Sequence, residues 1–191
     1  MEANDYPLNS KETPDPSPRV SMRDRLIMLA LCLVGAIVIL RPAIAFQSFS
    51  RGNFFLDNGS PKKAISQYQR AILLSPDFSD AYGYLGFAYK QSKQINEAIE
   101  AYKKALEINP KDSQVYFELG GVYFNRKDFK TATSYFQKAA DLDPSDLNYR
   151  NMYAVSLSKM GRVDEAISIW EGILQKNPEY NPAKINLDKY R

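Results

Sequence analysis

"LGFAYKQSKQINEAIEAYKKALEINP", residues 85–110, decides the fold of this chain, because the same pattern returns 34 residues later as "LGGVYFNRKDFKTATSYFQKAADLDP", residues 119–144. Prolines stand at positions 76, 110, 144 and 178, and alanines at 64, 98, 132 and 166, always 34 residues apart. An aromatic residue follows each alanine by four positions: Tyr68, Tyr102, Phe136 and Trp170. A fixed period of about 20 to 50 residues is the signature of a repeat architecture. The sequence therefore predicts one structural unit written four times.

The landmark residues predict that each unit is a pair of antiparallel helices. Small residues recur at Gly52, Gly86, Gly120 and Ala154, where a first helix would cross closely over the alanine of a second helix. Proline ends each second helix, because it restrains the residue before it and cannot continue the ladder of hydrogen bonds. Aromatic rings fill the wider space beside the crossings, so we expect packing roles for a group of five tyrosines: Tyr82, Tyr89, Tyr102, Tyr116 and Tyr123.

This spacing resembles that of the tetratricopeptide repeat (TPR), whose pattern is W-x2-L-G-x2-Y, then A-x3-F, then P. Residues 79–112 and 113–146 satisfy all its landmarks if other aromatics replace Trp. Residues 45–78 depart at Ser48 and Arg51, and residues 147–180 match least well, at Arg150, Tyr153, Leu157 and Ile173. The resemblance implies an all-α fold, a right-handed α-solenoid of these four repeats. Residues 181–191 are expected to form a helix that covers the last repeat with Ile185 and Leu187.

The N-terminal residues predict two further segments. Residues 1–25 hold four prolines and few large apolar groups, which is typical of a disordered tail. "LIMLALCLVGAIVIL", residues 26–40, has no charged side chain, but fifteen helical residues rise only about 22 Å, less than the ~30 Å hydrocarbon core of a bilayer. Continuing the run through Arg41 and Pro42 gives a sufficient length if Arg41 extends to the interface. We therefore predict a transmembrane helix over residues 26–44 and a single-pass membrane protein.

Two alternatives to this anchor remain open. Ala43-Ile44-Ala45 fits the small-x-small pattern of signal cleavage, which would release a secreted, soluble repeat protein. The run is also short enough for a buried helix of a soluble protein. Three arginines precede the span and two follow it closely, which slightly favours a cytoplasmic N-terminus and leaves the side of the repeats open: Arg19, Arg23 and Arg25 against Arg41 and Arg51.

The composition argues against several classes of function. The chain has no histidine and one cysteine, so it lacks the commonest general base, His-containing zinc sites and an internal disulfide. A net charge of +3, with basic and acidic residues interleaved, gives no sign of a nucleic-acid surface. We found no phosphate-binding or nucleophile motif. The sequence thus predicts no enzyme, no cofactor, no metal site, no nucleic-acid partner and no small-molecule substrate.

The resemblance implies a concave groove lined by positions 2, 5, 9 and 12 of each first helix. The predicted partner-binding residues at these positions are Phe49, Asn53, Leu56, Asp80, Phe87, Lys90, Gln114, Phe117, Phe124, Asn148, Asn151 and Val155, beside Phe46, Gly83, Gly121 and Ser158. The phenylalanines are typical of a partner site, although each could instead pack between helices. The positions where chaperone-binding relatives carry cations for an acidic C-terminus hold Phe49, Gln114 and Glu118, which disfavours that ligand.

We therefore expect a membrane-tethered adaptor that binds a protein segment in the groove and assists the assembly or localisation of a membrane-associated complex. The alternative is a scaffold that associates with itself and has no foreign client.

Overall fold

The computed structural model describes residues 21–190, apart from the side chains at positions 33 and 37. Within this range it contains nine helices and no strand. The chain divides into two compact units, one up to Leu40 and the other from Arg41 onward. Most of the predicted tail, residues 1–20, lies outside the described residues.

The long helix α1, Met22–Asp57, contains the apolar run. Its start is capped by Ser21, whose Oγ accepts a hydrogen bond from the backbone N–H of Asp24 at 3.2 Å. Residues 22–25, predicted as tail, are therefore helical. By length and composition α1 is the one described helix that could cross a membrane, with a mean hydropathy of 2.5 over its most apolar window. It continues past the predicted boundary at residue 44 with Pro42 inside it, and its last residues form the first helix of the first repeat.

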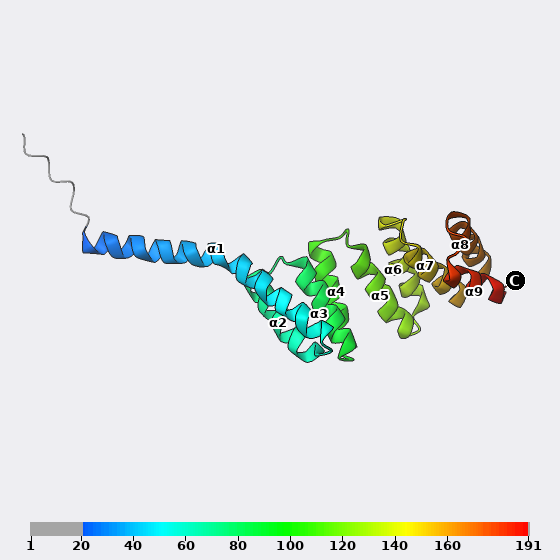
Figure 1. Ribbon diagram of the computed structural model, residues 1–191, viewed down its shortest axis with the longest axis horizontal. Coiled ribbons are helices and arrows are strands. Elements are labelled where there is room, and N and C mark those ends of the chain that lie inside the picture. The colour runs from blue at the N-terminus through cyan, green and yellow to red at the C-terminus, as the bar shows by residue number, and fades with distance from the viewer. Residues whose placement is uncertain (1–20, 191) are drawn as a thin grey trace, which may run out of the picture. The chain divides into compact units, whose positions relative to one another are not determined.

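Eight helices follow (Figure 1). They are α2 (Pro61–Leu74), α3 (Ser79–Gln91), α4 (Ile95–Ile108), α5 (Ser113–Asn125), α6 (Phe129–Leu142), α7 (Leu147–Lys159), α8 (Val163–Lys176) and α9 (Asn181–Tyr190). The end of α1 forms an antiparallel pair with α2, the next pairs are α3 with α4, α5 with α6 and α7 with α8, and α9 packs on α8. The second helices of the four repeats end at Leu74, Ile108, Leu142 and Lys176, two residues before each periodic proline. The predicted all-α repeat architecture is confirmed.

The small residues lie at the closest crossings inside each pair. A Cβ atom placed on Gly86 would lie 2.7 Å from Cδ1 of Tyr102, and one on Gly120 would lie 2.6 Å from Cδ1 of Phe136. Real side chains do not approach so closely, so only glycine lets the ring pack against the helix backbone. Alternation of a bare backbone with a buried ring thus sets the spacing within each repeat.

Aspartates cap three of the later helices. Asp112, Asp128 and Asp146 precede α5, α6 and α7, and each side chain accepts a hydrogen bond from a backbone N–H in the first turn. These bonds satisfy donors that a helix start otherwise leaves without a partner.

Helix α9 packs against α8 of the last repeat, and only one of the two aliphatic side chains expected to cover that repeat is buried. Leu187 is 4% exposed and Ala183 is fully buried against α8, whereas Ile185 is 68% exposed. The Tyr190 ring stacks on the Trp170 indole with centroids 5.7 Å apart. Ile185 lies on the outer side of a helix whose covering face recurs every three to four residues, and Ala183, Leu187 and Tyr190 share that face.

Candidate functional site

Four predicted groove positions lie together around one pocket between α3 and α5. They are Asp80, Gly83, Phe87 and Gln114, and the pocket has a volume of about 490 Å³. The rest of its lining consists of Tyr84, Tyr102, Asp112, Val115 and Glu118. This pocket is therefore our candidate site for a partner.

Gly83 lines the pocket without a side chain. A Cβ at this position would meet Cγ2 of Val115 at 3.3 Å, which is a tight contact, so a larger residue would crowd Val115 in the pocket wall. The neighbouring repeat has more space at the corresponding face, because a Cβ on Gly121 would touch nothing within 4 Å. Glycine at these two inner positions leaves room for a partner's chain near the helix backbone.

A chain of polar contacts joins three first helices beside the pocket. The Tyr149 hydroxyl donates to Oε1 of Gln114 at 2.8 Å, and Nε2 of Gln114 donates to Oε1 of Glu118 at 3.2 Å. Lys90 forms an ion pair with the other oxygen of Glu118. Because these groups satisfy one another, they hold α3, α5 and α7 in position, and Glu118 and Lys90 largely neutralise each other.

One polar group in the pocket is left without such a partner. Tyr102 is 1% exposed and is one of the lining residues, and its hydroxyl lies near the Glu118 carboxylate without forming a hydrogen bond of good geometry to any described group. Burial, and to a smaller extent the nearby Glu118 carboxylate, raise the pKa of Tyr102, so the hydroxyl keeps its proton and can donate. A buried donor without an acceptor is costly unless a ligand or water meets it.

Three of the phenylalanines predicted for the groove take part in core packing. Phe49 is 8% exposed and packs against Tyr68, Phe78 and Tyr84 with ring centroids 4.9 to 5.8 Å away. Phe117 and Phe124 are half-buried and both contact the buried ring of Phe136. The packing alternative therefore holds for Phe49, and Phe87 is the phenylalanine that lines the pocket.

The other predicted groove residues are spread over structural and exposed places. Asn151 is 6% exposed, and its Oδ1 accepts hydrogen bonds from the Trp170 indole and from Asn186, both at 3.0 Å. Asn53 accepts a hydrogen bond from the Tyr68 hydroxyl at 2.7 Å. Leu56 and Val155 pack against the cores of the first and last repeats, whereas Asn148 is exposed. Predicted positions on α3 and α5 thus contribute to one pocket, whereas those of the first and last repeats lie outside it.

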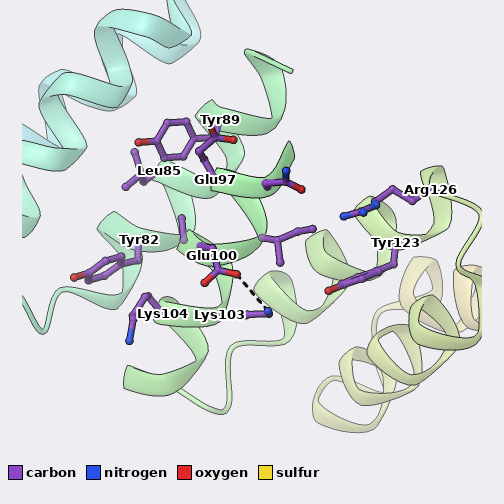
Figure 2. Close-up of a pocket in the computed structure, with 12 residues that line it drawn as sticks. Tyr82, Leu85, Tyr89, Glu97, Glu100, Lys103, Lys104, Tyr123 and Arg126 are labelled. Atoms are coloured by element: carbon purple, nitrogen blue, oxygen red, sulfur yellow. Dashed lines mark hydrogen bonds and ion pairs between the residues drawn. The ribbon is translucent and has the colours of Figure 1, made fainter. Parts of the chain in front are cut away.

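A second pocket, of about 660 Å³, lies around α4 and is lined also by residues of α3 and α5 (Figure 2). Its ionic groups include the exposed pair of Lys103 with Glu100, and Lys104, which pairs with Glu107. Both pairs join residues three apart on one helix, and exposed pairs of this kind are ordinary features of a solvated helix face. We therefore place the candidate site in the first pocket.

Comparison with family models supports the repeat assignment. Residues 55–119 match a tetratricopeptide-repeat model, and residues 91–173 match the model of anaphase-promoting complex, cyclosome, subunit 3. A search of curated proteins found no match to this chain.

Solved structures give the same fold at low sequence identity. YrrB, described as a TPR protein with an unusual peptide-binding site, is 24% identical to this chain. The match covers 76% of this chain and 75% of YrrB, with a TM-score of 0.68. PilF of Pseudomonas aeruginosa is 19% identical, with coverages of 78% and 68% and a TM-score of 0.70. MamA is 23% identical, with coverages of 71% and 74% and a TM-score of 0.65. Identities in this range establish the fold of the repeat region alone.

Proposed function

We propose that the protein, whose residues 55–119 match a tetratricopeptide-repeat model, is an adaptor that binds a segment of another protein in the pocket between α3 and α5. The adaptor is tethered to a membrane by α1 and assists the assembly or localisation of a complex there. The observation that carries this proposal is a pocket with aromatic side chains in its lining at the position where the resemblance places a concave groove.

Two properties of the lining support a protein partner. Tyr84 and Phe87 offer rings, which are enriched in the energetically dominant centres of protein interfaces. The site is also prepared in advance, because Gln114 is bonded to Tyr149 of α7 and Glu118 is paired with Lys90 of α3, which fixes the surrounding helices. A fixed site loses less conformational entropy on binding than a flexible one.

A photo-crosslinking amino acid tests where the partner binds. At position 84 it should trap a partner in native membranes, while at position 73 on α2 it should not, because Leu73 is 74% exposed and lies outside the pocket. Phe87→Glu should abolish the crosslink from position 84, whereas Leu73→Glu should preserve it, and thermal melts would verify that both variants are folded. Equal crosslinking from the two positions would refute the proposal.

Anchoring by α1 has a separate test. With its mean hydropathy of 2.5 and no side chain buried in the most apolar window, α1 favours insertion into a bilayer. The full chain should then stay in the membrane pellet after alkaline carbonate extraction. Release into the supernatant would instead favour signal cleavage or a peripheral protein.

Self-association is the second candidate, and the first repeat favours it. Arg51 and Phe54 of α1 are exposed, although their counterparts 34 residues later, Leu85 and Ala88, are buried in the core that α2 and α3 share. A second copy could cover this open face. Sedimentation of the full chain in detergent would then show an oligomer that dissociates on dilution and is lost in Phe54→Glu, whereas an adaptor stays monomeric until its client is added.

A further inference from the structure

We propose that the client segment presents a basic side chain, arginine or lysine, to the pocket between α3 and α5, where the carboxylates of Asp80 and Asp112 receive it. This inference rests on the proposed function and names the chemistry of its partner. A basic ligand is opposite in charge to the acidic C-terminus that chaperone-binding relatives hold.

The first observation in support of a basic ligand is the negative charge of the pocket lining. Three carboxylates, those of Asp80, Asp112 and Glu118, line the pocket, and no lysine or arginine does. Lys90 stands beside it and pairs with Glu118, which leaves two negative charges in excess. Neither Asp80 nor Asp112 is in an ion pair among the residues that the structure describes. The uncompensated charge of the site is therefore negative.

The rings of the lining fit the stem of such a side chain. Tyr84 is 45% exposed at the pocket, and Phe87 lies next to it on the following turn of α3. A cation already lies over Phe87, because Nζ of Lys90 is 4.7 Å from the centroid of that ring. The methylene stem of an arginine or lysine can pack on these rings while its charged end reaches the carboxylates.

The unsatisfied hydroxyl of Tyr102 is an independent sign of a ligand. It is buried, belongs to a residue that lines the same pocket, and has only the nearby Glu118 carboxylate beside it, without good hydrogen-bond geometry. Since a tyrosine with a raised pKa stays protonated, this hydroxyl donates, and a backbone carbonyl of the client is the acceptor that an extended segment supplies. The pocket thus offers acceptors for a cation and a donor for the peptide chain that carries it.

The test uses the full chain in detergent micelles and a displayed library of random 12-residue peptides. We expect the selected peptides to share an arginine or lysine at one position. Synthetic copies of the best peptide should lose affinity about tenfold when this residue becomes glutamine. Asp80→Asn with Asp112→Asn should weaken the original peptide by about the same factor and should leave the glutamine peptide unchanged, since both changes remove one interaction.

The variants keep the helices intact, and a matched control exists. Asp112 caps α5 through a 3.0 Å bond from the N–H of Val115, and asparagine is an equally good cap. Asp146→Asn makes the same change at the cap of α7, outside the pocket, and should leave the affinity unchanged. Tyr102→Phe should weaken peptide binding severalfold without lowering the melting temperature, because the hydroxyl makes no bond within the described chain.

Two outcomes would overturn this inference. The first leaves the proposed adaptor function standing, and the second refutes it as well. If selected peptides need Phe87 but carry no basic residue, or bind the double aspartate variant equally well, the basic ligand is refuted and the adaptor function stands. If no selected peptide loses affinity in Phe87→Ala, which removes the ring without adding charge, the pocket is not the binding site and both proposals fail.

Discussion

Two neighbouring glycines on α5 give a sharp test of the repeat packing. A methyl group at Gly120 would lie 2.6 Å from Cδ1 and 2.7 Å from Cε1 of Phe136, a ring that is fully buried. A methyl group at Gly121 would meet no atom within 4 Å. Both changes to alanine improve helix propensity by about 1 kcal/mol. Only the first also forces two helices apart.

The expected effects of the two substitutions have opposite signs. Overpacking of a core costs about 1–3 kcal/mol, and the tight, immobile contact at Gly120 places this site at the upper end. After the gain in propensity, Gly120→Ala should lower the free energy of unfolding by about 1–2 kcal/mol, and Gly121→Ala should raise it by about 0.5–1 kcal/mol. At about 2–4 °C per kcal/mol for a chain of this size, the two melting temperatures should differ by at least ~3 °C.

The assay is a thermal melt of the full chain in one detergent, followed by circular dichroism. If Gly120→Ala stabilises the protein as much as its neighbour does, the close crossing of α5 and α6 is not the reason for glycine at this position.

Three further predictions concern the end of the array and its dependence on pH. Asn151→Ala leaves the buried indole N–H of Trp170 without an acceptor and should cost about 1–3 kcal/mol, with a shift in tryptophan fluorescence; unchanged stability would mean that water replaces the amide. Leu187→Ala should cost about 2–4 kcal/mol in a denaturant titration, while Ile185→Ala stays within about 0.5 kcal/mol, and equal effects would contradict the covering role of α9. A backbone hydrogen bond holds the pKa of Asp128 below its ordinary value of 3.8, so the stability that its charge contributes is present above that value and is lost as the pH falls through the lower folded-state value. The melting temperature of Asp128→Asn should therefore fall less than that of the parent between about pH 5 and pH 2, and parallel profiles would refute this assignment.

The periodic part of the structure could be predicted because each landmark acts over a short distance. A proline ends its own helix, and Gly86 meets Tyr102 within one repeat, so the residue types alone report the contact. The covering helix at the end of the chain was predictable for the same reason. The face of α9 that packs against the last repeat could not be predicted, because Ile185 and Leu187 are equally apolar and only the docking angle of the helix decides which of them is buried.

The site was harder to predict, since it depends on contacts between repeats. Asp80, Phe87 and Gln114 from the predicted positions lie around one pocket, and Tyr84 and Tyr102, which line it too, lie outside the four expected positions. Phe49 occupies a groove position in the pattern, yet the ring of Tyr84 and the side chain of Phe78 close over it. The spacing of Gln114 and Glu118, four apart on one helix, was the available signal for the polar contacts around the pocket.

The ion pair of Lys90 with Glu118 has a mechanical consequence. Glycine-to-ring crossings stiffen the first three repeats internally, whereas this pair bridges the junction between the second and third repeats, with side chains 30% and 16% accessible to water. Dissolved ions weaken such a bridge and leave the internal crossings untouched. The junction between the second and third repeats should therefore become more flexible as the ionic strength rises.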